Sequence, residues 1–179
     1  MKKLTQVLLV TVLLSTFFFG GSASTASAKE PQILEFDTMV GVPRPYTGGI
    51  NAIRGVPGGG LPWVVASAEG ELTASGQLEI IVQGLVIDPN DPAAITAGRA
   101  GTNPSATFRA MVSCLSKDAA GTPTTVNIST DPFPATTGPA SSGGGNAEVE
   151  ATLDLPEPCI APIIFVTSPT GSWFAATGF

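Results

Sequence analysis

Residues 107–115 are the stretch that most restricts what this chain can fold into. Apolar and mixed positions alternate strictly along it, and it reaches one of the only two cysteines in the sequence. Side chains alternate across a β-strand with a period of two, so the pattern predicts a central strand with two distinct faces. One face is expected to carry Phe108, Ala110, Val112 and Cys114, and the other Arg109, Met111, Ser113 and Leu115.

The other cysteine, Cys159, opens the next strongly apolar run of the chain. A thiolate zinc site needs more ligands than two cysteines supply, and a redox motif needs closer spacing. The sequence therefore predicts a disulfide between Cys114 and Cys159, which would tie the middle of the chain to its end. Two buried free thiols are the alternative.

The N-terminus is typical of a secretory signal peptide. Lys2 and Lys3 precede an apolar run at residues 7–19, and small residues follow as far as Ala28. The apolar run of about 13 residues is shorter than the roughly 20 that a membrane-spanning helix needs. We predict a signal peptide at residues 1–28 and a single secreted domain at residues 29–179, without a membrane span in the mature chain. An N-terminal anchor that is never cleaved is the alternative.

Charge and composition exclude several classes of partner and of chemistry. The predicted mature chain has six basic and fourteen acidic residues, a net charge of −8. Binding to nucleic acid or to anionic lipid depends on basic residues that neutralise phosphate, so neither partner is expected. The chain also has no histidine, which excludes nucleophiles activated by imidazole and histidine-based zinc sites. No cofactor is predicted.

Turn signals at near-regular spacing separate the remaining strand-like segments. Residues 63–73 and 78–82 form the clearest predicted hairpin, with Val64, Ala66, Ala68 and Leu72 expected to point inward. Further strands are expected at residues 124–128, 147–153, 160–167 and 173–179, and Asp91 before Pro92 predicts the cap of a short helical segment within residues 93–99. The number of expected strands favours an all-β fold, namely an antiparallel β-sandwich of about eight strands. A small closed β-barrel is the alternative.

Residues 40–62 contain seven glycines and show little periodicity, which predicts a long surface excursion. Structureless loops longer than about 15 residues in a compact domain are usually functional or disordered. The candidate ligand-contact residues are Arg44, Tyr46, Arg54 and, at the exit of the loop, Trp63, which are residue types that often dominate interfaces. A cell-surface, anionic or carbohydrate-like partner would suit them. The alternative is an irregular cover, in which the two rings pack underneath and the arginines pair with Glu35 or Asp37.

Two pairs of carboxylates have the spacing that places both members on one face of a strand, Glu69 with Glu71 and Glu148 with Glu150. Two acids could serve glycoside hydrolysis, although acids that alternate with apolar residues are also typical of a solvated outer face.

A lesser candidate is a calcium site at Asp88, Asn90 and Asp91, because calcium takes six to eight oxygen ligands. The intervening prolines and the missing distal glutamate depart from the known calcium loop, and turn chemistry accounts for these residues equally well.

Three phrases of the sequence resemble small exported bacterial proteins to which no activity is attached: residues 108–116, 129–135 and 158–169. In layout, the hairpin around residues 74–76 and the ending at residues 165–179 are similar to the chordin-type β-sandwich modules of secreted bacterial proteins. The histidine-bearing strand of that module has no counterpart here, so the resemblance implies a secreted sandwich without a shared ligand.

The leading functional hypothesis is a non-catalytic exported protein with a binding or structural role outside the cytoplasm. It rests on a full set of strands without a catalytic constellation. The alternative is a secreted, glycosidase-like hydrolase that uses the paired carboxylates.

Overall fold

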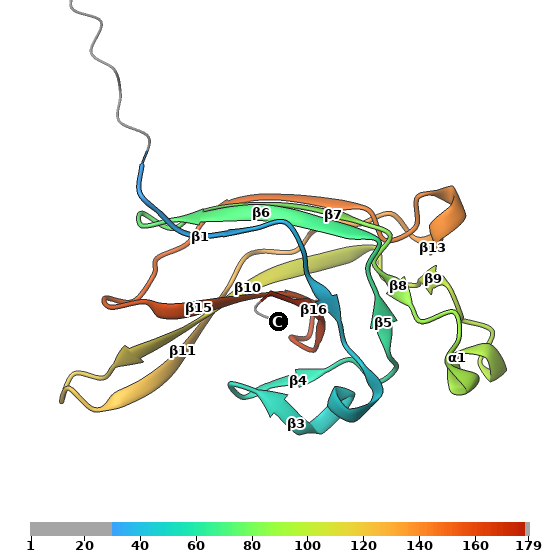
Figure 1. Cartoon of the computed structure of the whole chain (residues 1–179), viewed down its shortest axis with the longest axis horizontal. Helices are drawn as coiled ribbons and strands as arrows, with labels where there is room; N and C mark the ends of the chain where they lie inside the picture. Colours follow the sequence, from blue (N-terminus) through green and yellow to red (C-terminus); the bar gives the residue numbers. More distant parts are fainter. Residues whose placement is uncertain (1–29, 178–179) are drawn as a thin grey trace, which may run out of the picture.

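The structure is a computed structural model that describes residues 30–177, so the predicted signal peptide lies outside the described residues. The chain consists almost entirely of β-strands in two main sheets (Figure 1), which confirms the predicted all-β sandwich. Eight strands of the described part have five or more residues: β1 (Gln32–Phe36), β3 (Gly48–Ile53), β6 (Ser67–Thr73), β7 (Gln77–Gln83), β10 (Thr107–Lys117), β11 (Pro123–Ser129), β14 (Ala147–Thr152) and β15 (Ile160–Thr167).

The smaller sheet has the strand order β1-β6-β7-β14, and the larger one follows β11-β10-β15-β16-β4-β3, with β12 beside β10 and β2 beside β16. Two short pairs, β5 with β8 and β9 with β13, form separate two-stranded sheets. The short elements are β2 (Val40–Gly41), η1 (Arg44–Tyr46), β4 (Val56–Gly58), β5 (Trp63–Val64), β8 (Val86–Ile87), α1 (Pro92–Thr96), β9 (Thr102–Asn103), β12 (Phe133–Pro134), β13 (Gly138–Pro139), η2 (Ala140–Ser142) and β16 (Trp173–Ala176). Within residues 30–177, no helix has the length and apolar character needed to cross a membrane.

β10 is the central strand that the alternation predicted. It pairs with β11 on one side and with β15 on the other. Its core-facing side chains Phe108, Ala110, Val112 and Cys114 are all fully buried, as expected. On the opposite face Leu115 is exposed, whereas Ser113 is also fully buried. The larger sheet curls, so that β3 and β4 lie below β10 and β15 in the view of Figure 1. Arg54, between β3 and β4, reaches Ser113 and donates a hydrogen bond to its carbonyl oxygen.

Aromatic rings fill both concave spaces of the fold. Between the sheets, Trp63 stacks on Phe174 with ring centroids 3.9 Å apart, and the edge of Phe108 contacts both rings. Inside the curl of the larger sheet, the ring centroid of Trp173 lies 6.4 Å from that of Tyr46 and 6.0 Å from that of Phe165. Such pairs contribute about 0.5–1.5 kcal/mol beyond the area they bury. Ring packing therefore fixes residues near 46 and 63 against the C-terminal strand.

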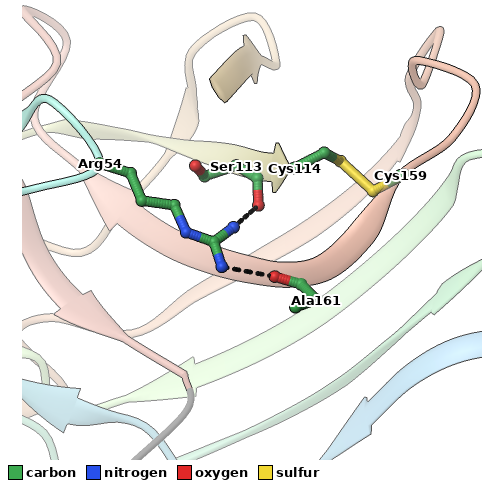
Figure 2. The surroundings of a disulfide bond; sticks show 5 residues. All are labelled: Arg54, Ser113, Cys114, Cys159 and Ala161. Atoms are coloured by element: carbon green, nitrogen blue, oxygen red, sulfur yellow. Dashed lines mark hydrogen bonds between the residues drawn. A yellow bond between two sulfur atoms is a disulfide. The ribbon is translucent and has the colours of Figure 1, made fainter. Parts of the chain in front are cut away.

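The predicted disulfide between Cys114 and Cys159 is present (Figure 2), with the two Cα atoms 4.9 Å apart. It joins the core-facing side of β10 to the residue that precedes β15. The β10–β15 register shifts beside it, between Ser113 and Leu115, and Ala161 adopts a positive φ of 46° there. The disulfide thus fixes the two central strands where their ladder is irregular.

Arg54 connects the curl of the larger sheet to this irregular point. Its guanidinium donates hydrogen bonds to the carbonyl oxygens of Ser113 (2.7 Å) and Ala161 (2.8 Å), as Figure 2 shows. The Nδ2 of Asn127 in β11 donates in turn to the carbonyl oxygen of Arg54. The turn between β3 and β4 is therefore held against three other strands of its own sheet. Burial lowers the pKa of the Arg54 guanidinium from its ordinary value.

The prediction of a long surface excursion at residues 40–62 is wrong, because the segment contributes β2, β3 and β4 to the larger sheet. β2 pairs antiparallel with β16, and β4 pairs with it in parallel. Two glycines permit this close packing: a Cβ at Gly41 would lie 2.1 Å from the carbonyl oxygen of Trp63, and one at Gly58 would lie 2.0 Å from that of Tyr46. Glycine is typical of loops, but at these two positions it allows the backbones of neighbouring segments to come into close contact.

The β6–β7 hairpin and the α1 cap are confirmed, with one difference in the hairpin. Ala68 and Leu72 are buried as expected, but Val64 and Ala66 are exposed, because the first strand divides into β5 and β6 and its alternation is not continuous. Asp91 is the N-cap of α1 and accepts hydrogen bonds from the amides of Ala93 and Ala94.

Candidate functional site

Four glutamates lie in register across all four strands of the smaller sheet. Glu35 of β1 is paired with Glu71 of β6, Glu71 with Glu79 of β7, and Glu79 with Glu150 of β14. Neighbouring strands lie about 4.8 Å apart, so the row extends over roughly 14 Å. Because side chains alternate along each strand, all four point away from the buried face of the sheet.

A second, partial row of acids lies beside the first. Glu69 and Glu148 both face Ile81 of β7, one from each side, and Asp37 follows the end of β1. The two rows border an open hollow of about 610 Å³, and the described residues that line it include no lysine or arginine. We call this surface the carboxylate face; it consists of Glu35, Asp37, Glu69, Glu71, Glu79, Glu148 and Glu150.

The acids of the carboxylate face are accessible to solvent, except that Glu71 is half-buried. Gln32 donates a hydrogen bond to the Oε2 of Glu71. Like charges directly opposite each other on neighbouring strands are destabilising, whereas cross-strand pairs of opposite charge contribute roughly 0.2–1 kcal/mol. The row therefore lowers the stability of the fold, and a bound cation would relieve the repulsion.

The structure brings both predicted carboxylate pairs to one surface, with β7 between them. Sequence reasoning missed Glu35 and Glu79, which complete the row. A signal for Glu79 was present, because residues 77–83 alternate between exposed and buried positions and Glu79 occupies an exposed one. Its alignment with glutamates on both neighbouring strands depends on register, which that pattern does not contain.

The candidate calcium residues have other hydrogen-bond partners. Asp91 accepts hydrogen bonds from the Nε of Arg44 at 2.9 Å and from its Nη2 at 2.6 Å, in addition to the α1 amides. Oδ1 of Asp88 accepts from the amide of Asn90. Among residues 30–177, no three acidic or cysteine side chains are placed to hold one metal ion. The three oxygen-bearing residues act as a turn and a helix cap.

Arg44 lowers the pKa of the Asp91 carboxyl below its ordinary value, chiefly through its side-chain hydrogen bonds. Burial acts in the opposite direction, and the amides of Ala94 and Ala93 support the lowering. The Asp91 side chain is 4% exposed and that of Arg44 53% exposed. The ion pair therefore fastens η1 to the start of α1.

We expect Asp91→Asn to lower stability at neutral pH, because asparagine can still cap α1 but cannot pair with Arg44. The pair contributes fully above the ordinary carboxyl pKa of about 3.9, and its contribution is lost as the pH falls through the lowered pKa of folded Asp91. The difference between wild type and variant should thus shrink as the pH falls below about 4. Urea unfolding at several pH values measures it, and equal stabilities at neutral pH would contradict the role of the pair.

The predicted ligand-contact residues do not form one site. Arg44 and Trp63 border a groove of about 460 Å³ that Asp91 also lines, but Arg54 lies elsewhere, beside the disulfide (Figure 2). Tyr46 is half-buried and Trp63 is 5% exposed. The two rings pack as the cover alternative expected, whereas the arginines bind Asp91 and backbone carbonyls in place of Glu35 or Asp37.

The carboxylate face brings seven acidic side chains from the four strands of the smaller sheet and the end of β1 to one open surface of the described part of the chain. Comparison with protein-family models, with curated proteins and with solved structures found no match to this chain.

Proposed function

We propose that this chain is an exported, non-catalytic binding protein whose carboxylate face holds a cationic partner. The observation that carries the proposal is the row Glu35, Glu71, Glu79 and Glu150, which crosses every strand of the smaller sheet. Repulsion along the row lowers stability in the free protein and is relieved when positive charge binds. The spread of the row over roughly 14 Å suits a partner with several separated charges.

Export is supported by two independent features. The basic residues, apolar run and small residues before Ala28 have the order of a secretory signal peptide. The Cys114–Cys159 disulfide is of a kind that persists in oxidising compartments. Together they favour a location outside the cytoplasm. An anionic or sugar-like partner at residues 40–62 has less support, because Arg44 and Arg54 have internal partners.

A glycosidase-like hydrolase is the second candidate, and it is favoured by the facing carboxylates Glu79 and Glu150 beside a hollow. Such enzymes need one carboxyl group that stays protonated and one that is ionised, which differing environments produce. Both carboxyls here are exposed on an open surface, so their environments are similar. Turnover on a polysaccharide panel that Glu150→Gln abolishes would favour the hydrolase over the binding protein.

Binding of oligolysine by the purified mature chain tests the proposal. We expect binding that weakens steeply as salt rises, because exposed charges are screened over about 8 Å at physiological ionic strength. The triple variant Glu35→Gln/Glu79→Gln/Glu150→Gln should bind at least tenfold more weakly in fluorescence anisotropy. Asp118→Asn, which removes one exposed acid from the turn after β10, should bind as wild type does. Equal affinity of the triple variant and wild type would refute the proposal.

A further inference from the structure

Beyond its first residues, the outer edge of β14 carries backbone groups for which the described strands show no pairing. On one side β14 pairs with β7 over all six residues. On the other side, the described residues show one bridge, between Ala135 and Ala147 at the start of the strand. On the β7 side, the amide of Leu153 donates to the carbonyl oxygen of Gly76, which directly precedes β7. Because directions alternate along a strand, the amides of Glu148, Glu150 and Thr152 point away from β7. The first of them lies at the bridge, and those of Glu150 and Thr152 lie beyond it.

A groove runs along this edge. It has a volume of about 400 Å³. One wall is formed by residues 149–153, in β14 and just beyond it, and the other by residues 129–133, from the last residue of β11 to the first of β12. An unpaired strand edge is a template for a further strand, and an extended peptide that adds there gains main-chain hydrogen bonds. The groove supplies space for such a peptide at the amides of Glu150 and Thr152.

The two faces of β14 define the side chains that an added strand would need. On the outer face, Glu148 and Glu150 present carboxylates beside the edge. On the inner face, Ala151 and Leu153 line the groove together with the half-buried ring of Phe133. Side chains of the added strand would alternate between these two environments. Basic residues suit the outer positions, and small apolar residues suit the inner ones.

We propose that the free edge of β14 accepts an extended polypeptide segment in which lysine or arginine alternates with small apolar residues, as a fifth strand of the smaller sheet. The inference rests on the proposed function and specifies the partner of the carboxylate face. Charge complementarity selects this occupant over a second copy of the chain. Two antiparallel β14 strands would place Glu148 and Glu150 against the same residues of the other copy, where like charges repel.

The test uses a fluorescent peptide of alternating lysine and valine and two derivatives, N-methylated at all valine amides or at all lysine amides. One derivative should bind at least tenfold more weakly, because alternate amides of an added strand face its neighbour. Amide exchange at Glu150 and Thr152 should slow at least tenfold when the unmodified peptide binds. Exchange at Glu35, on the opposite edge strand, should not change.

Two single variants at opposite ends of the glutamate row serve as a matched pair. Glu150→Gln should weaken peptide binding at least fivefold, and Glu35→Gln less than twofold, because of these two glutamates Glu150 alone borders the proposed strand. If both methylated derivatives bind like the parent and exchange at Glu150 is unchanged, the edge inference is overturned while the proposed function stands. If neither the alternating peptide nor oligolysine binds at low salt, the proposed function itself fails.

Discussion

The variant Cys114→Ala/Cys159→Ala is expected to lose about 4 kcal/mol of unfolding free energy, the largest effect that the structure predicts. The bridge joins residues 45 positions apart, and in the chain-entropy model a loop of this length restricts the unfolded chain by about that amount. Domains of this size are stable by only about 5–15 kcal/mol. Urea unfolding without reductant measures the loss.

Two comparisons separate the effect of the bridge from that of the lost sulfur atoms. Reduced wild type retains both sulfurs, so its stability relative to the oxidised protein reports the bridge alone. Cys159→Ala changes only a half-buried position, whereas Cys114 is fully buried, so this single variant disturbs core packing least. Alkylation of both thiols in folded, unreduced protein would show that the bridge does not form.

Glu79→Lys is expected to raise stability and to weaken binding of cationic partners at the same time. Lysine at this position would face Glu71 and Glu150, so two repulsive pairs become attractive. Cross-strand pairs are worth about 0.2–1 kcal/mol each, so a gain of about 1 kcal/mol at low salt is expected. Oligolysine affinity should fall more than tenfold, because the centre of the carboxylate face becomes positive. Thermal unfolding and fluorescence anisotropy measure the two effects.

The matched control is Asp154→Lys, which makes the same change of charge at an exposed residue just beyond β14. It should leave stability and oligolysine affinity close to those of wild type. Higher stability together with weaker binding in Glu79→Lys would be characteristic of a functional surface that lowers the stability of its fold. A variant Glu79→Lys that is less stable than wild type would show that the row is not repulsive.

Local patterns predicted much of the fold. Alternation within residues 107–115 was sufficient to identify β10 and its buried face, because consecutive side chains of a strand point to opposite faces. Asp91 before Pro92 likewise identified the start of α1, since a cap and its helix are adjacent in sequence. The cysteine pairing followed from there being only two cysteines.

The carboxylate face could be predicted only in pieces. The spacing of Glu69 and Glu71 shows that they share a face, but nothing near them indicates that Glu35 and Glu79 stand opposite Glu71. Register between strands depends on turns and on packing across the core. For β7 and β14, the partners are also separated by more than sixty residues of intervening chain. A face assembled from four strands has no continuous signature in the sequence.

The strands within residues 40–62 could not be predicted for a related reason. Their glycines satisfy steric demands that come from Trp63 and Tyr46, and their strand partner is β16. Arg54 satisfies backbone carbonyls that a register shift in distant strands leaves available. Without these distant partners, residues 40–62 have the composition of a loop, and Arg44 and Arg54 look like cations available for a ligand.

The partners of this early segment also set an order of events in folding. Arg54 binds carbonyl groups 59 and 107 positions further along the chain, and β2 and β4 pair with β16. A polypeptide is made from its N-terminus, so residues 40–58 emerge long before the strands that give them a place. The β6–β7 hairpin can form as soon as it is made, whereas contacts between distant residues form slowly. The larger sheet can therefore be completed only once residues 173–176 are available, because β2 and β4 pair with β16.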